Sequence, residues 1–288
     1  HLWWRLDRAL ELEDCHLSAM VALIDAVRHG TTTLIDHHAS PHAVRGSLDA
    51  LARAVTRVGL RACLCYELSD RDGVQIAGQG LAENLAFLER CTREPDPHLR
   101  ALLGLHAAFT LSDATLERAA AEARRLGAGF HVHIAEAASD QEYSLREHGV
   151  RVVDRLHRLG LLGSTTIAAH CVHVDDREMD QLAASGTAVA HCPQSNMNNA
   201  VGVADVPAMT RRGILVGLGT DAMTENMLEE LRAALWVRHL ATGNPSAGFA
   251  ETVATLVANN ATIADRLWPG FGLGELREGG AAHLILID

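Results

Sequence analysis

The 288-residue sequence contains no apolar run near the ~18 residues that a membrane-spanning helix needs, so a protein embedded in a bilayer is not expected. Its first residues, HLWWRLDRAL, do not have the layout of a signal peptide. Basic residues form no block, and the formal net charge of −11 disfavours nucleic acid or an anionic membrane surface as a partner. These absences favour a small-molecule partner, and they leave homo-oligomer formation open.

Cysteine is also sparse. The 6 cysteines show no CxxC pair and no disulfide-scaffold density, which predicts a reducing, cytoplasmic compartment. In the motif CLC, Cys63 and Cys65 are expected to be core residues rather than redox-active ones. Histidine is abundant, with 17 residues. Either these histidines are scattered over the surface, or some of them form a metal site.

Apolar strands alternate with amphipathic helices along the chain, a pattern typical of a parallel sheet covered by helices. Helices are predicted at 15–30, 81–90, 114–125, within 140–160, from Asp175 to Gly186, near Pro207, at 225–241 and at 249–265. Strands are predicted at 31–38, 61–68, 100–110, 129–136, 165–174, 187–196 and 213–222, with a last one in HLILID at 283–288.

Polar side chains lie at or near the carboxyl ends of six different predicted strands: His37, His106, His133, His170, His191 and Asp221. In a barrel these ends converge on one mouth, whereas in an open sheet they would be spread along an edge. This favours a (β/α)8 TIM-type barrel. Because the pattern gives seven strands before the last one, the barrel is expected to lack its first strand.

The stretch GFHVHIAEA, residues 129–137, carries the clearest chemical signal. Alternation places His131 and His133 on one face of a strand, and Glu136 falls just past its end. Neutral imidazoles and carboxylates are the ligands that zinc and similar ions take, which makes His133, His170 and Asp221 candidate ligands. Glu136 is placed to act on a water molecule as a proton shuttle. The alternative is an ordinary strand with two core histidines, and for His131 packing is the favoured role.

Several motifs together resemble a known family. HIAE (133–136), AAHCVH (168–173), HCPQSN (191–196) and GLGTDAMTENM (217–227) resemble the amidohydrolase superfamily, in its branch of ring deaminases and triazine chlorohydrolases. WWRLDRAL, TTTLIDHHASP, CYELSDRDG and GLHAAFTLS are similar to the SsnA-type aminohydrolases. The resemblance covers the whole chain.

The resemblance implies a metal ligand at His133 and a proton-shuttling Glu136. It further implies that His170 and Asp221 flank the attacking water, with Asp221 also a ligand. His106 matches a position that contacts substrate in these deaminases. Substrate contact by His37 or His38 is a weaker expectation, and His191 is expected to have a structural role.

The sequence also departs from the family pattern. The His-x-His of the first barrel strand is absent, so the chain is expected to be a fragment. Residues 1–266 would form the metal-dependent barrel, and residues 267–288 would begin the C-terminal part of a truncated β-sandwich.

The function expected is a hydrolytic deaminase that releases an amine from an amino-substituted nitrogen heterocycle. It would use a divalent ion, with zinc favoured over iron or manganese. Chlorohydrolysis on the same scaffold is the nearest alternative. A non-catalytic barrel used for binding or assembly is the alternative from another class.

Overall fold

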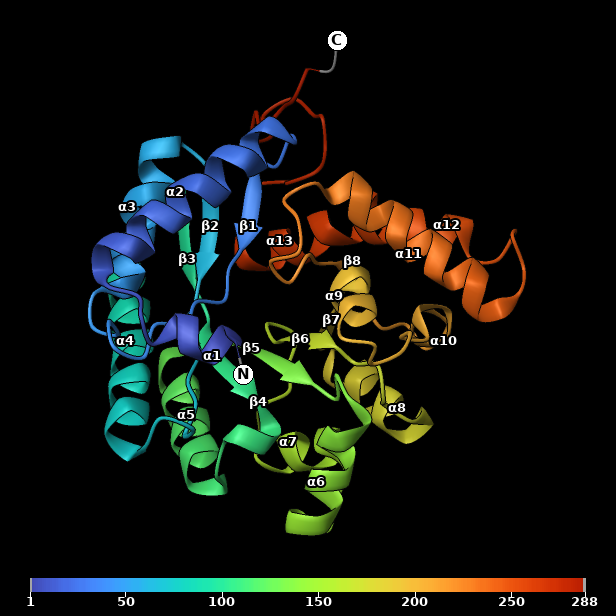
Figure 1. Ribbon diagram of the computed structural model, residues 1–288. Helices are drawn as coiled ribbons and strands as arrows, with labels where there is room; N and C mark the ends of the chain where they lie inside the picture. Colours follow the sequence, from blue (N-terminus) through green and yellow to red (C-terminus); the bar gives the residue numbers. More distant parts are fainter. Residues whose placement is uncertain (1, 287–288) are drawn as a thin grey trace. The chain divides into compact units, whose positions relative to one another are not determined.

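The computed structural model describes residues 2–286 (Figure 1). Two compact units make up the chain: the first ends at His131 and the second begins at Val132. Among the described residues, no helix has both the length and the apolar character needed to cross a membrane.

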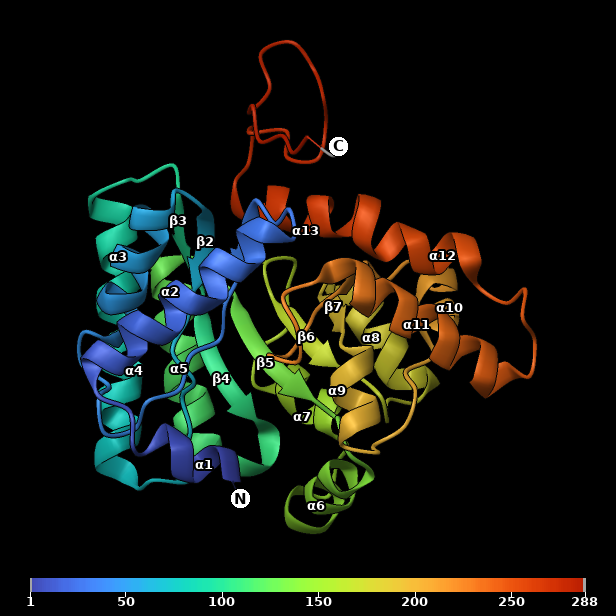
Figure 2. The same cartoon turned by 45° about the horizontal axis from the view of Figure 1, so that its top comes forward.

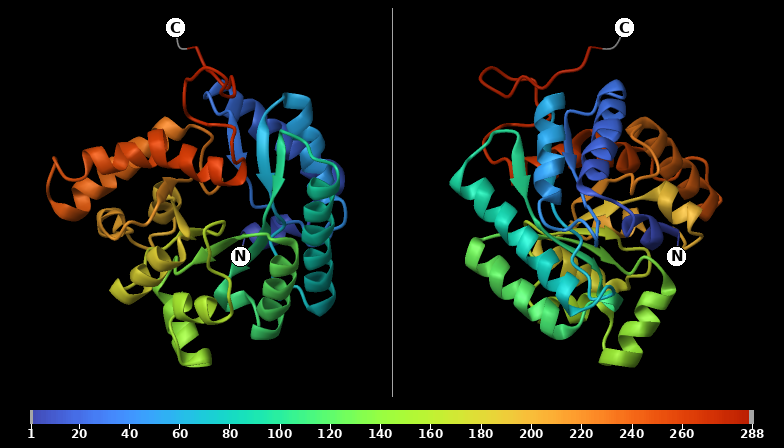
Figure 3. Two further views of the ribbon diagram at one scale, coloured as in Figure 1. Left: turned by 180° about the vertical axis from the view of Figure 1, so that it is seen from behind. Right: turned by 60° about the vertical axis from the view of Figure 1, so that its left-hand side comes forward.

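The first unit contains a parallel sheet in the order β1-β2-β3. Its strands are β1 (Thr33–Ile35), β2 (Arg61–Leu64), β3 (Leu99–Ala101), β4 (Leu103–Ala107) and the start of β5 (Phe130–Ile134). Its helices are α1 (Leu2–Asp7), α2 (Leu12–Arg28), α3 (Ser47–Val58), α4 (Val74–Arg93) and α5 (Asp113–Leu126). Helices α4 and α5 run side by side (Figure 3).

The strand predicted at 100–110 is divided at Leu102. Its first part, β3, pairs with β2 in parallel register. Its second part, β4, lies next to the segment that comes after β2 in the chain, where Leu68 N donates to Gly104 O over 3.1 Å. The strand then ends in a 3₁₀ turn, Ala108–Thr110. One predicted strand therefore forms two shorter ones because its halves follow different parts of the neighbouring segment.

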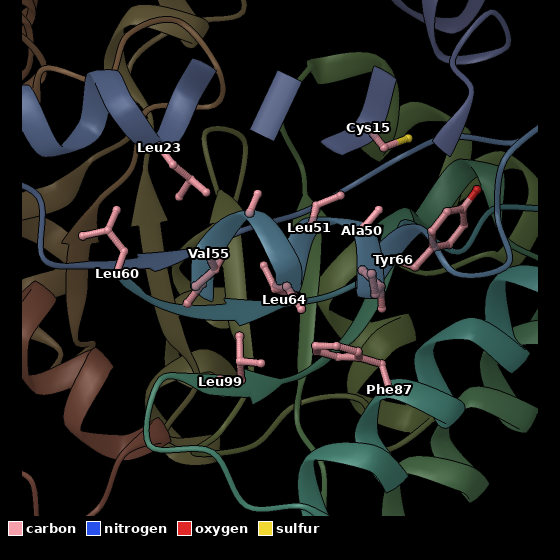
Figure 4. Close-up of a cluster of buried hydrophobic side chains, with 14 of the residues drawn as sticks. Cys15, Leu23, Ala50, Leu51, Val55, Leu60, Leu64, Tyr66, Phe87 and Leu99 are labelled. Carbon is pink, nitrogen blue, oxygen red and sulfur yellow. The ribbon is translucent and has the colours of Figure 1, made fainter. Parts of the chain in front are cut away.

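The core of the first unit lies between its sheet and the helices that cover it (Figure 4). Leu51 and Val55 of α3 pack in the same cluster as Leu64 of β2, and each is 5% exposed or less. Phe87 of α4 joins this cluster and is 3% exposed. Burial of apolar side chains on both faces explains why the strands here lack a polar alternation.

The second unit contains the parallel strands β6 (Ile167–His170), β7 (Ala188–His191) and β8 (Val216–Leu218). The rest of β5 lies next to the end of β6, where Cys171 N donates to Ile134 O over 2.9 Å. The helices are α6 (Ala138–His148), α7 (Val152–Arg158), α8 (Asp176–Ser185), α9 (Pro193–Asn198), α10 (Val206–Arg211), α11 (Met227–Thr242), α12 (Phe249–Ala254) and α13 (Asn260–Leu267). Figure 2 shows α11, α12 and α13 following one another in orange and red.

Two asparagines cover the outer edge of β8. A π-helical segment, Thr255–Asn259, joins α12 to α13 inside the helix predicted at 249–265. Asn259 Nδ2 donates to Val216 O over 2.8 Å. Asn260 Oδ1 accepts from Leu218 N over 2.8 Å, and its Nδ2 donates to Leu218 O over 2.9 Å. Because β7 pairs with the other edge, β8 has hydrogen-bond partners on both sides.

Several local predictions are confirmed. Helix α8 begins at an Asp175–Glu178 capping box and ends at Gly186, which has a φ of 72°. Ser112 caps α5 by accepting from Thr115 N. The predicted alternation of parallel strands and helices is also found. Closure of the strands into a barrel stays a prediction.

Two predicted strands are corrected. The strand predicted at 187–196 ends at His191, because Pro193 occupies the first turn of α9 and favours a helix start. In HLILID, residues 283–286 lie outside any strand, and residues 287–288 fall outside the described residues. The predicted division into residues 1–266 and 267–288 stays a prediction.

Candidate metal centre

Three candidate ligands from separate segments of the second unit lie together. His133 is in β5, His170 is the last residue of β6, and Asp221 lies in the turn after β8. One ligand atom from each lies within 4.8 Å of the others. The two imidazole rings are stacked, with 5.5 Å between their centroids and 26° between their planes. Two imidazoles and a carboxylate are a donor set that suits zinc and similar divalent ions.

The backbone is left-handed at the strand ends that carry these groups. His170 has a φ of 70° and Cys171 a φ of 50°, while Asp221 has a φ of 46°. Residues other than glycine adopt this conformation at a cost of ~1–3 kcal/mol each, and such residues gather at functional sites. Backbone hydrogen bonds hold it in place after β6, where His173 N donates to Ala135 O over 2.9 Å. This turn directs the His170 side chain toward the candidate centre.

The segment after β7 supplies a partner to each of three site residues. Ser195 Oγ donates to Asp221 Oδ2. Asn196 Oδ1 lies 3.0 Å from His170 Nδ1. The third contact runs from Asn199 Nδ2 to Glu136 Oε1 over 3.0 Å. The sequence pattern does not reveal these partners, because the strand predicted at 187–196 includes Ser195 and Asn196 and no motif marks Asn199. The signal that indicates a helix here is Pro193, a helix-start residue.

The His170 imidazole is buried beside two carboxylates and a second imidazole. Its Nε2 lies 3.9 Å from Glu136 Oε2 and 3.8 Å from Asp221 Oδ2. Burial lowers the pKa of His170, neighbouring His133 lowers it further, and the two carboxylates oppose this effect. The imidazole is therefore neutral at neutral pH.

The neutral imidazole fits an ion at this position. With Asn196 Oδ1 as acceptor, Nδ1 of His170 carries the hydrogen and Nε2 carries the lone pair. Nε2 is buried and has no hydrogen-bond partner among residues 2–286. A buried acceptor without a partner costs free energy, and an ion or a polarised water would satisfy it.

The other two predicted site residues, His106 and His37, belong to the first unit, and their contact with substrate stays a prediction. Nδ1 of His106 lies 2.8 Å from Thr110 Oγ1. His37 Nε2 lies 3.5 Å from Glu67 Oε2. Next to the centre, His191 is buried at the end of β7, and burial together with His170 lowers its pKa to about 4.

His133, His170 and Asp221 thus form a candidate site for a divalent ion near the carboxyl ends of strands. The model of the amidohydrolase family matches residues 1–288, and the chain belongs to this family. The family and its solved members imply a TIM-barrel-like α/β fold.

The chain is 33% identical over 290 residues to 5'-deoxyadenosine deaminase of Methanopyrus kandleri, covering 99% of this chain and 64% of that protein. It is 35% identical over 292 residues to 5-methylthioadenosine/S-adenosylhomocysteine deaminase of Moorella thermoacetica, covering 100% of this chain and 65% of that protein. The chain thus spans less than two thirds of the length of these curated relatives.

Among solved structures, an adenosine deaminase of Xanthomonas campestris with bound zinc is similar, with a TM-score of 0.85 and 26% identity over 97% of this chain and 63% of that chain. An atrazine chlorohydrolase of Arthrobacter aurescens complexed with zinc has a TM-score of 0.79 and 23% identity over 97% of this chain and 65% of that chain. The second likeness concerns the fold alone.

Proposed function

We propose that the protein is a metal-dependent hydrolytic deaminase. The observation that carries this proposal is the grouping of His133, His170 and Asp221 within 4.8 Å of one another, with Glu136 3.9 Å from His170. Hydrolysis at a carbon that bears an amine requires an activated water and a group that transfers protons. A divalent ion held by these ligands would activate the water, and a carboxylate can transfer the protons. Zinc is the ion we propose, in keeping with the zinc-bound relative.

The substrate we propose is an adenosine derivative. Relatives at 33% and 35% identity are named for 5'-deoxyadenosine and for 5-methylthioadenosine or S-adenosylhomocysteine. These names share an adenine ring and differ at the 5' position. The leaving group would then be the exocyclic amine of the ring.

His133 and Asp221 would hold the ion. An ion held there supplies Lewis acidity, which lowers the pKa of a water molecule from ~15.7 towards ~7. The Nε2 lone pair of His170 either joins the ligands or accepts a proton from the attacking water. Both uses need the neutral imidazole that burial favours.

Glu136 would move the protons that the substrate needs. It would pass a proton taken from the attacking water to a ring nitrogen, which makes the adjacent carbon more electrophilic. It would then relay the second proton of that water to the departing amine. Asn199 donates to one carboxylate oxygen over 3.0 Å and so leaves the other oxygen, Oε2, to face the centre. This hydrogen bond would orient Glu136 for transfer.

The proposal also covers the closure of the sheet and two residues that would contact substrate. We propose that the strands close into a (β/α)8 barrel, as the 0.85 TM-score to a zinc-bound deaminase supports. In that arrangement His106 would contact substrate, as would His37 if it is not used otherwise.

The test is product formation from matched substrates. The zinc-loaded protein is incubated with adenosine, 5'-deoxyadenosine, 5-methylthioadenosine and a 6-chloropurine riboside, and ammonia and chloride are measured. We expect ammonia from the amino compounds and loss of its release in Glu136→Gln, with the exposed Glu142→Gln as the matched control. Release of chloride alone would favour the chlorohydrolase, and ion binding without any turnover would favour the non-catalytic barrel.

A further inference from the structure

A second group of side chains that could hold a metal ion lies in the first unit. It consists of His37, two residues beyond β1, Cys65, one residue beyond β2, and His131 of β5. One ligand atom from each lies within 4.8 Å of the others. The function proposed above does not use Cys65 or His131.

The distances in this group match those of a thiolate–imidazole metal site. Cys65 Sγ lies 3.5 Å from His37 Nδ1 and 3.8 Å from His131 Nδ1. In a tetrahedral zinc site, metal bonds of ~2.3 Å to sulfur and ~2.0–2.1 Å to nitrogen place the sulfur and nitrogen atoms about 3.6 Å apart. The two rings meet edge to face, with centroids 4.6 Å apart and an interplanar angle of 73°.

The carboxylate of Glu67 lies next to one of these candidate ligands, His37. Glu67 Oε2 lies 3.5 Å from Nε2 of His37, and Glu67 Oε1 is 2.7 Å from Arg71 Nη2. A carboxylate next to the outer nitrogen of an imidazole favours a hydrogen on that nitrogen and leaves the lone pair on the other one. For His37, the lone pair then sits on Nδ1, the atom that faces Cys65.

We propose that His37, Cys65 and His131 form a binding site for a thiophilic divalent ion of the zinc type. On binding, the Cys65 thiol gives its proton to solvent and a sulfur–metal bond forms in place of the S–H, which in the metal-free protein donates to Asp36 O over 3.2 Å. A solvent molecule would complete the coordination. The ion would tie together the segments that follow β1 and β2 and the start of β5, so its role is structural, and His37 would then serve as a ligand rather than contact substrate.

Sulfur distinguishes this site from the centre in the second unit, whose candidate ligands are nitrogen and oxygen only. The probe is Co²⁺, because a thiolate–Co²⁺ bond gives an intense near-ultraviolet charge-transfer band that imidazole and carboxylate ligands do not give. We expect this band on titration of the wild-type protein and of Asp221→Asn. We expect its loss in Cys65→Ser, and its retention in Cys91→Ser, a control thiol on α4.

Ion binding should also stabilise the fold, because a ligand that binds only the native state raises the unfolding temperature. Zn²⁺ should raise the melting temperature of Asp221→Asn by more than it raises that of the double variant Asp221→Asn, Cys65→Ser. If the Cys65 variants fail to fold, X-ray absorption of the Co²⁺-loaded wild-type protein decides, since it reports a cobalt–sulfur distance of ~2.3 Å if the site exists. Absence of sulfur among the cobalt ligands, or a charge-transfer band that persists in folded Cys65→Ser, would overturn the proposal. Neither result would bear on the deaminase centre.

Discussion

Asn196 Oδ1 lies 3.0 Å from Nδ1 of His170 and thereby fixes which nitrogen of this buried imidazole carries the hydrogen. The lone pair on Nε2 then points to the side where the carboxylates of Glu136 and Asp221 lie. The orientation of one histidine thus depends on an amide in a short helix, α9, that begins two residues beyond the end of β7.

Replacing this amide should weaken ion binding. In Asn196→Ala the His170 ring loses the partner of Nδ1, and the loss of such an outer partner typically costs ~10–100-fold in metal affinity or activity. Zinc titration against a competing chelator measures this. Met197→Ala, an exposed neighbour in the same helix, is the control and should bind zinc as the wild type does. Equal affinities in the two variants would show that Asn196 does not position His170.

Glu136→Gln should retain the ion and lose turnover. The amide keeps the shape of the side chain but cannot carry a proton, so ammonia release should fall by the ~10²–10⁴-fold typical of general acid–base groups. Metal content and ammonia release are measured on the same sample. Undiminished turnover would remove Glu136 from proton transfer.

Asp221→Asn should lower both metal content and turnover. A neutral amide is a weaker ligand than a carboxylate. Loss of a residue that only orients a ligand typically costs ~10–100-fold in metal affinity, and we expect the loss of a ligand itself to cost at least as much. The control is Asp176→Asn, whose side chain is 82% exposed. Treatment of the wild type with a chelator should abolish activity, and added zinc should restore it. Normal metal content and rate in Asp221→Asn would place this carboxylate outside the centre.

Glu230 should make stability depend on pH. Its side chain is buried in α11, and burial raises its pKa from 4.5 to about 7, with Asp221 and Glu229 adding to the rise and a hydrogen bond from Gln194 N opposing it. Because the fold favours the protonated form, the stabilisation is complete below the ordinary pKa and is lost as the pH rises through about 7.

The change should be on the order of 2–3 kcal/mol in the free energy of unfolding. Glu230→Gln, which stays neutral, should lose less stability than the wild type between about pH 5.5 and about pH 8.5. Denaturant unfolding with a chelator present measures this without a contribution from bound metal. The exposed Glu142→Gln, which is not among the groups that shift the pKa of Glu230, should behave as the wild type. A wild-type stability that does not fall over this range would contradict the assignment.

The grouping of His133, His170 and Asp221 could be predicted from the sequence, because the carboxyl ends of neighbouring parallel strands lie at the same edge of a sheet. Their position at strand ends is visible in the apolar pattern alone. Their roles in catalysis stay predictions. The same rule underlies the expectation for His106 and His37, which belong to the first unit and whose contact with substrate stays a prediction.

What the sequence did not predict depends on local backbone geometry. Left-handed conformations are expected at glycine, so nothing in AAHCVH indicates that His170 and Cys171 adopt them. The strand predicted at 187–196 runs past Pro193 and so overlaps helix α9. The polar side chains of this helix are therefore not expected, from the sequence, to be partners of the site residues. The cluster of His37, Cys65 and His131 joins residues far apart in the sequence, and no spacing motif marks it.

Asn259 and Asn260 also affect whether a further strand can pair with the edge of β8. A strand edge with free amide and carbonyl groups is a template on which a strand of another molecule can add, and this is a common route to aggregation. At β8 the asparagine side chains already take the bonds that an added strand would make. A strand that pairs with β8 along this edge, from another molecule or from this protein, would therefore have to displace the two amides from Val216 O and from both backbone groups of Leu218.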